Sequence, residues 1–185
     1  MNSDLVLWDA ARAAALAAFT VLSVSLLTGM ALRTALLAAL ARNRAVLAFH
    51  GFLTWFWLPL VAVHVTALVL DGTARIGVLD LLVPFRVGYA RLAVGLGTVG
   101  LLLLVLVGVT SALRRRMSPR VWHAVHLLSY PMFGVFLLHA QLAGSDVSRT
   151  WISALGWATG AGLAMLALPR VAGARVGAGR SVTDP

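Results

Sequence analysis

The chain has 185 residues, 61% of them hydrophobic and only 11% charged, with a mean hydropathy of +0.93. A soluble domain is about 45–50% apolar, so the composition excludes an ordinary soluble protein and predicts a single integral membrane domain. The absence of cysteine excludes disulfides, cysteine-ligated iron–sulfur clusters and covalently attached c-type haem.

The formal charge of +9 is carried entirely by arginine. Such a basic soluble protein would suggest nucleic acid as a partner. Here the arginines fall in short loops between apolar runs, which indicates membrane topology and no nucleic-acid partner. The N-terminal stretch MNSDLVLWDAAR has no basic leader and no small-residue cleavage site. We therefore interpret it as the start of the first span and not as a removed signal peptide.

Five apolar segments have the length of roughly 17–25 residues that a helix needs to cross a bilayer. They are 13–32, 45–70, 91–113, 121–142 and 151–168, and the first could begin near Leu5. We expect an all-α membrane bundle over residues 1–170 and a disordered tail, rich in Gly, Ala and Arg, over 171–185. The stretch IGVLDLLVPF is too short to span, so it is expected to lie along the outer surface, with Pro84 ending any helical turn.

The arginines are distributed unevenly between the two sides of this topology. One side holds ten arginines and one acid, and the other holds five arginines and five acids. The basic side carries Arg33, Arg42, Arg44, Arg114, Arg115, Arg116, Arg120, Arg170, Arg175 and Arg180 with Asp184. Because positively charged loops stay in the cytoplasm, we expect a multi-pass plasma-membrane protein with its N-terminus outside and its C-terminus inside.

Two spans carry histidines at matching depths. His50 and His64 lie fourteen positions apart in the second span, which is about 21 Å along a helix and only some 40° around its axis. His126 and His139 lie thirteen positions apart in the fourth span, which runs parallel to the second. Since imidazole is costly in hydrocarbon, the spacing predicts two metal centres, His50 with His126 and His64 with His139.

Haem iron is the metal that suits these centres. A bis-histidine haem needs two facing imidazoles with apolar and aromatic walls. Zinc or copper would need three or four ligands at one depth, and each level supplies two, or three if His123 joins. Aromatic residues around the histidines fit the walls, and glycines 51, 95, 97, 100, 108 and 134 would let a large ring approach the backbone.

The fourth span departs from an ideal helix at one point. Thirteen residues leave His126 and His139 roughly 140° apart around a regular helix axis. Pro131 lies between them, and a proline kinks or rewinds a helix. We therefore predict a kink or π-type bulge near residues 129–134 that brings His139 round to face His64.

These residues resemble the ferric reductase-like transmembrane domain, a family that includes NADPH oxidases and the membrane haem subunit of bacterial methionine sulfoxide reductase systems. The resemblance extends from LWDAAR to about Asp146. It is carried by His50-x13-His64, VPF, TSALRRR, WHAVHLLSY with His126-x12-His139, and AGSD. It implies that the four histidines are the axial ligands of two b-type haems, with His123 as an extra histidine.

The resemblance also implies the direction of electron flow and the partners. Electrons would come from a separate cytoplasmic flavin reductase, because the chain has no Gly-rich dinucleotide fingerprint in a strand–helix setting. They would then pass to an external acceptor. The chain would then be the membrane haem subunit of an oxidoreductase, with flavin supplied only through the partner. One alternative is a haem subunit feeding a periplasmic reductase such as methionine sulfoxide reductase. The alternative of another class is a metal-binding or transport protein without redox function.

Several other residues have two possible roles at this point. The haem propionates could pair with Arg12 and Arg91 at the outer level and with Arg44 and Arg120 at the inner level, although arginines also serve as topological anchors. His123 is either a surface or supporting residue or an alternate ligand. Trp55 and Trp57 could sit between the haem levels. The outer acids Asp71, Asp80 and Asp146 either attract a cation or are simply solvated.

Overall fold

The computed structural model describes residues 3–31, 44–73, 75–144, 146 and 149–179. All regular structure in these residues is helical: α1 (Ser3–Ala31), α3 (Arg44–Leu70), η2 (Val78–Leu81), α4 (Arg91–Ala112), η3 (Arg114–Arg116), α5 (Pro119–His126), α6 (Ser129–Ala143) and α7 (Thr150–Gly179). Five segments are long and apolar enough to cross a membrane, with α5 and α6 together forming the fourth. The prediction of an all-α fold with five helices that could span a membrane is confirmed for the described residues.

Two helices are longer than the sequence predicts. α1 begins at Ser3 and not at Ala13, which places Asp9 and Arg12 on the helix. α7 continues as a helix to Gly179, into the segment for which the sequence predicts disorder. Residues 180–185 and the loop arginines Arg33 and Arg42 lie outside the described part of the chain.

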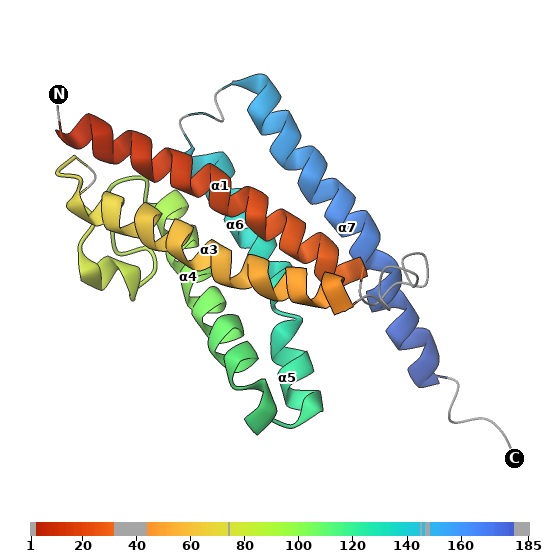
Figure 1. Ribbon diagram of the computed structural model, residues 1–185. Helices are drawn as coiled ribbons and strands as arrows, with labels where there is room; N and C mark the ends of the chain where they lie inside the picture. Colours follow the sequence, from red (N-terminus) through yellow and green to blue (C-terminus); the bar gives the residue numbers. More distant parts are fainter. Residues whose placement is uncertain (1–2, 32–43, 74, 145, 147–148, 180–185) are drawn as a thin grey trace, which may run out of the picture.

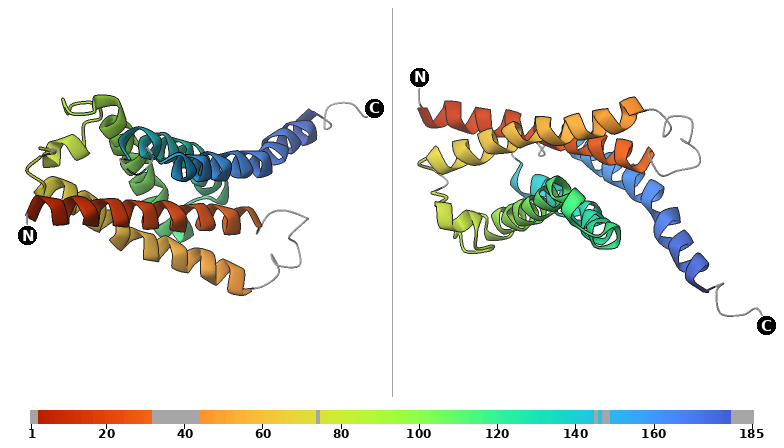
Figure 2. Two further views of the ribbon diagram at one scale, coloured as in Figure 1. Left: turned by 90° about the horizontal axis from the view of Figure 1, so that it is seen from above. Right: turned by 60° about the horizontal axis from the view of Figure 1, so that its bottom comes forward.

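The helices form two pairs that lie against each other (Figure 1). α1 packs along α3, and α4 packs along α6, while contacts between α1 and α6 join the pairs. α7 touches α1 and α6 and then leaves the bundle toward its C-terminal end (Figure 2). We call the end of the bundle that holds His64 and His139 the His64 end, and the opposite end the His50 end.

The fourth span is interrupted where α5 ends and α6 begins, at residues 127–128. Pro131 has no N–H, so it cannot donate to the Leu127 carbonyl as a helix requires. The Tyr130 amide donates to the Leu127 carbonyl instead (3.1 Å), and the Leu128 amide donates to the Val125 carbonyl (3.0 Å). Both bonds join a residue to the one three positions earlier, which is the tighter 3₁₀ spacing. The predicted interruption is confirmed, but it lies just before 129–134, and the π-type widening was wrong.

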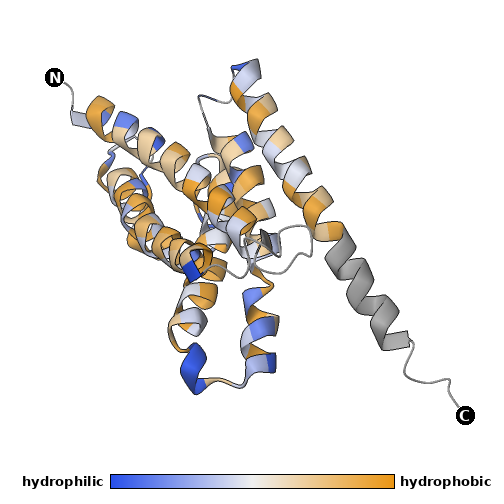
Figure 3. Cartoon of the chain, turned by 45° about the vertical axis from the view of Figure 1, so that its right-hand side comes forward, coloured by the Kyte–Doolittle hydropathy of each residue, from blue (hydrophilic) through white to orange (hydrophobic). Residues whose placement is uncertain are grey.

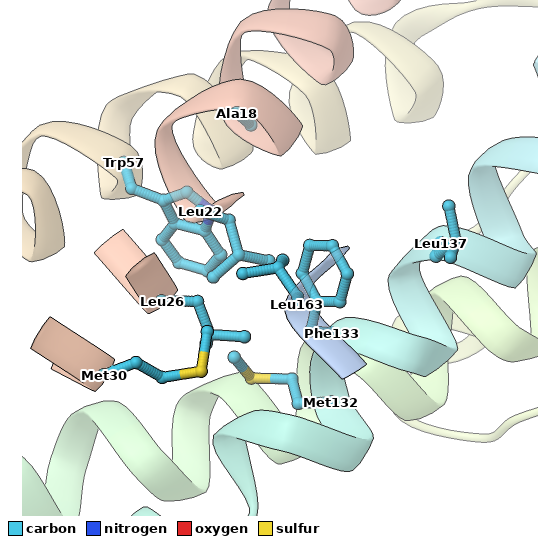
Figure 4. Close-up of a cluster of buried hydrophobic side chains, with 9 residues drawn as sticks. All are labelled: Ala18, Leu22, Leu26, Met30, Trp57, Met132, Phe133, Leu137 and Leu163. Carbon is cyan, nitrogen blue, oxygen red and sulfur yellow. The ribbon is translucent and has the colours of Figure 1, made fainter. Parts of the chain in front are cut away.

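A cluster of buried apolar side chains fills the bundle between the two ends (Figure 4). Its members come from α1, α3, α6 and α7: Ala18, Leu22, Leu26, Met30, Trp57, Met132, Phe133, Leu137 and Leu163. Trp57 lies seven residues from both His50 and His64, and Phe133 lies near the middle of the stretch between His126 and His139. These two aromatic rings therefore occupy the middle of the bundle, between the levels of the histidines.

Replacing Trp57 by alanine should destabilise the bundle strongly. Its side chain is 6% exposed, and removing a buried tryptophan typically costs about 3–5 kcal/mol through lost contacts and a residual cavity. Trp55 on the same helix is 70% exposed, so Trp55→Ala is the matched control and should change stability little. Denaturant unfolding of both variants in the same detergent, followed by helical circular dichroism, measures the difference. Equal midpoints for the two variants would contradict this packing.

Most residues of the long helices are hydrophobic (Figure 3). Large exposed hydrophobic side chains occur on every span, for example Phe52, Trp55, Leu106, Leu138 and Met165. Hydrophilic residues gather at the helix ends, above all at the turn between α4 and α5 that holds Arg114–Arg116. Such a surface suits a lipid bilayer and would be unstable in water.

Candidate functional site

The four histidines of the second and fourth spans meet in two pairs. The ring centres of His50 and His126 are 6.3 Å apart, and the ring centres of His64 and His139 are also 6.3 Å apart. In both pairs α3 supplies one imidazole, while α5 supplies the second at the His50 end and α6 at the His64 end. The structure thus brings together the residues that the sequence pairs, at two separate levels.

Each pair has the spacing expected for two ligands on opposite sides of one metal ion. A metal–imidazole bond is about 2 Å long and a ring nitrogen lies about 1.2 Å from the ring centre, which puts the two ring centres about 6.4 Å apart. The observed separation of 6.3 Å agrees with this value in both pairs. The two rings of a pair are also steeply inclined, at 80° and 73°. The geometry therefore fits a pair of axial ligands.

Hydrogen bonds from neighbouring helices orient the imidazoles. His50 Nδ1 lies 2.9 Å from the Ser25 carbonyl, and His64 Nδ1 lies 2.9 Å from the Ala11 carbonyl. His139 Nδ1 lies 2.8 Å from the Ala93 carbonyl. A carbonyl only accepts, so Nδ1–H donates and the neutral ring keeps its lone pair on Nε2, the nitrogen available to a metal. Histidine ligands in metalloproteins are commonly oriented in this way.

His126 is positioned by a hydroxyl group and by an aromatic ring. Its Nδ1 lies 3.3 Å from the Ser111 hydroxyl of α4. Its ring stacks on Trp122 with centres 5.0 Å apart and planes inclined by 23°. The Arg114 guanidinium lies 5.4 Å from the centre of the Trp122 ring. Trp122 entered the sequence analysis only as the first residue of WHAVHLLSY, and its stacking on His126 was not predicted, although residues four apart are neighbours on a helix.

Two glycines allow the imidazoles to lie against the supporting helices. A Cβ at Gly29 of α1 would be 3.1 Å from His50, and a Cβ at Gly97 of α4 would be 2.8 Å from His139. Gly97 was expected to face a large ring, and it faces the imidazole itself. Two more of the expected glycines meet aromatic side chains, Gly95 at Phe85 and Gly100 at Phe136, whereas Cβ atoms at glycines 51, 108 and 134 would meet nothing within 4 Å.

The donor set at each level is two imidazoles. No three His, Cys, Asp or Glu side chains gather to hold a metal ion among the residues that the structure describes. Zinc sites in proteins use three or four protein ligands, whereas a haem supplies four nitrogens itself and needs two axial ligands. The pairs therefore suit haem iron better than a bare ion.

The arginines considered for haem propionates differ in their surroundings. Arg12 Nε donates to Asp146 Oδ2 at 2.8 Å, a second guanidinium nitrogen donates to Asp146 Oδ1, and Asp9 lies 3.4 Å away. Arg91 Nε donates to the Phe85 carbonyl at 2.7 Å. Arg44 and Arg120 are exposed in the first turns of α3 and α5, at the His50 end. Propionate binding by any of the four stays a prediction.

The remaining residues with two possible roles are placed as follows. Asp80 lies 3.6 Å from Arg86 and Asp146 is bound by Arg12, so both acids are paired with arginine and not simply solvated. Asp71 is 3% exposed, and one of its oxygens accepts from the Thr73 amide. Trp57 lies in the buried core between the levels, whereas Trp55 is 70% exposed and faces out of the bundle. His123 lies beside Trp122, with ring centres 6.3 Å apart.

The Arg12–Asp146 pair should make stability depend on acid pH. Hydrogen bonding to Arg12 lowers the pKa of Asp146 below its ordinary value of about 4. A carboxyl whose pKa is lower in the folded state stabilises fully above its unfolded pKa and loses that effect as pH falls through the folded pKa. Because the pair is partly exposed, we expect Asp146→Asn to cost only about 0.5–1 kcal/mol at pH 7.

Thermal unfolding of the wild type and Asp146→Asn from pH 7 down to pH 3 measures this contribution. The difference in melting temperature should be largest near pH 7 and should shrink at the acid end. Asp9→Asn is the matched control, because Asp9 lies 64% exposed and touches only one guanidinium nitrogen of Arg12. A difference that grows as pH falls would contradict the assigned ion pair.

No protein family, no curated protein and no solved structure matches the chain. The fold and the site define a class of their own: an all-helical chain with five helices long and apolar enough to cross a membrane, in which two pairs of histidines face each other.

Proposed function

We propose that this chain is a membrane dihaem cytochrome that carries electrons across the bilayer, with His50 and His126 as axial ligands of one b-type haem and His64 and His139 as ligands of the other. One observation carries the proposal: two facing imidazole pairs share the same 6.3 Å spacing at two levels of an apolar bundle. The resemblance to the ferric reductase-like transmembrane domain supports it through the same four residues.

The residues of the chain would do three things for such a cofactor. A haem bound at each pair would supply reversible one-electron chemistry. α1 and α4 hold the imidazoles through the carbonyls of Ala11, Ser25 and Ala93, which fixes Nε2 as the ligand. The buried rings of Trp57 and Phe133 fill the space between the levels and exclude water there. The two levels lie about 20 Å apart along the helices, so an electron would cross most of the membrane by passing from one haem to the other.

The direction of transfer follows from the arginine distribution. The turn with Arg114, Arg115 and Arg116 lies at the His50 end, and by the positive-inside rule this end faces the cytoplasm. Electrons would enter at the His50 level from a separate flavin reductase and leave at the His64 level to an external acceptor. A periplasmic reductase such as methionine sulfoxide reductase, in place of a small acceptor, is a variant of the same function with the same histidine pairs.

A reduced-minus-oxidised optical spectrum of the purified protein, with haem quantitation, tests the proposal. We expect a b-type spectrum and two haems per chain. Colourless protein, after expression with ample haem supply, would end the proposal and favour a membrane protein without redox function. A periplasmic protein that co-purifies with the haem-loaded chain would select the variant in which a protein accepts the electrons.

A further inference from the structure

A hollow of about 410 Å³ opens at the His64 end, on the loop between α3 and α4. The side chains that line it and can bind a ligand are Thr73, Arg75, Asp80, Arg86 and Tyr89. None of these residues belongs to the histidine pairs or to the Arg12–Asp146 ion pair. The hollow is therefore a separate feature that electron transfer does not explain.

The lining of the hollow favours an anion. It contains two guanidinium groups and two hydroxyl groups, which are donors, against the single carboxylate of Asp80. Asp80 already accepts from the Gly77 amide at 2.8 Å and lies 3.6 Å from Arg86. Arg75 is exposed and forms no ion pair among the described residues. The excess of positive charge and donors suits a phosphate, which guanidinium groups bind through parallel hydrogen bonds.

The loop that carries the hollow is held in a defined conformation. The Thr98 hydroxyl donates to the Asp80 carbonyl at 2.9 Å, and Arg91 Nε donates to the Phe85 carbonyl at 2.7 Å. The residues with positive φ other than glycine, within the described part of the chain, all lie in this loop: Arg75 (49°), Phe85 (62°) and Ala90 (40°). Side chains rarely adopt this conformation unless the surrounding structure imposes it, and such positions cluster at binding sites.

The residues around the hollow are of the kinds found at the level of lipid headgroups. Val78, Leu79 and Leu82 of the same loop are 66%, 57% and 61% exposed, beside the arginines. Apolar side chains next to arginine and tyrosine are typical of the membrane–water interface. The hollow is also linked to the bundle, because Thr98, which holds Asp80, follows Gly97, which lies against His139.

We propose that this hollow binds a phosphate group, either that of an anionic lipid headgroup or that of a soluble phosphate. Arg75 and Arg86 pair with the phosphate oxygens, and Tyr89 donates its hydroxyl. The site goes beyond the proposed electron transfer and does not require haem. Its failure would therefore leave the dihaem proposal standing, and the absence of haem would leave this site standing.

Two binding measurements on the full chain, delipidated in a neutral detergent, test the site. In the first, native mass spectrometry counts bound short-chain phosphatidylglycerol, with phosphatidylcholine as the comparison lipid. In the second, calorimetry measures the binding of inorganic phosphate, with chloride as the comparison anion at the same ionic strength. Binding of phosphatidylglycerol alone identifies the lipid as the source, and binding of phosphate as well identifies a soluble anion.

The variants are chosen to separate binding from folding. Arg75→Gln should weaken binding about tenfold, and because Arg75 forms no ion pair with another described residue the fold should be unaffected. Arg86→Gln should do the same, and Tyr89→Phe gives a milder loss if Arg86→Gln does not fold. Arg149→Gln, an exposed arginine at the same end but outside the hollow, should bind as the wild type does. Wild-type protein that binds neither probe, or Arg75→Gln that binds like the wild type, would overturn the proposal.

Discussion

Replacing His139 by alanine is expected to lower the haem content of the purified protein from two per chain to one. The ring centres of His139 and His64 are 6.3 Å apart, so His139 is the second proposed ligand of that level. A haem left with one axial histidine in an apolar bundle is held weakly and is lost during purification. Pyridine haemochrome quantitation against protein mass measures the change. His64→Ala should give the same result, because it removes the opposite ligand of the same level.

His123→Ala is the matched control for the ligand substitutions. His123 lies on the same span as His126, but its ring is beside Trp122 and belongs to neither facing pair. This variant should keep both haems. The double variant His64→Ala with His139→Ala should still hold one haem, because the two levels are separate. Unchanged haem content in His139→Ala, or loss of both haems in it, would overturn the assignment of one haem to each pair.

Adding a single methyl group at Gly97 should also weaken the His64 level. The Cβ of Gly97→Ala would lie 2.8 Å from the His139 ring, closer than real Cβ contacts, so the ring must move. Its hydrogen bond to the Ala93 carbonyl, at 2.8 Å, would be lost or lengthened. Since partners that orient a metal ligand typically contribute 10–100-fold in metal affinity, we expect haem at this level to bind about tenfold or more weakly.

Gly108→Ala on the same helix separates this effect from helix propensity. A Cβ there would meet no other atom within 4 Å, while both substitutions gain the same advantage of alanine over glycine, about 1 kcal/mol. Haem retention in the two variants is compared during competition with apomyoglobin, which captures released haem. Gly97→Ala that retains haem as well as Gly108→Ala does would show that His139 does not need the close approach.

The sequence predicted the spans and the histidine pairs because both depend on properties that single residues carry. A run of apolar side chains must be a helix in lipid, where backbone groups find no water, and five such runs appear as five spans. The fourteen-residue spacing of His50 and His64 places both on one face of α3, since helix geometry is regular. Pro131 likewise predicts an interruption of the fourth span, because proline has no N–H to donate to the helix.

Other parts of the site could not be predicted because they depend on which helices lie side by side. Ala11 and Ala93 orient His64 and His139 through backbone carbonyls, and every residue has such a carbonyl. Gly97 was noted as a glycine that lets a large ring approach, but its contact with His139 was not predicted, because it depends on the packing of α4 on α6. The hollow at Arg75 and Arg86 depends on the path of a loop, which no periodic pattern describes.

The sequence by itself determined five helices that are long and apolar enough to cross a membrane, and four histidines at two matched positions along two of them. The tertiary structure decided that the histidines face one another at 6.3 Å, and that α1 and α4 hold their Nδ1 atoms. The physical reason is that hydrophobicity and helical phase are local properties of the chain. The approach of two imidazoles and the acceptor of each Nδ1–H are set by helix packing and by the tightened turn before Pro131.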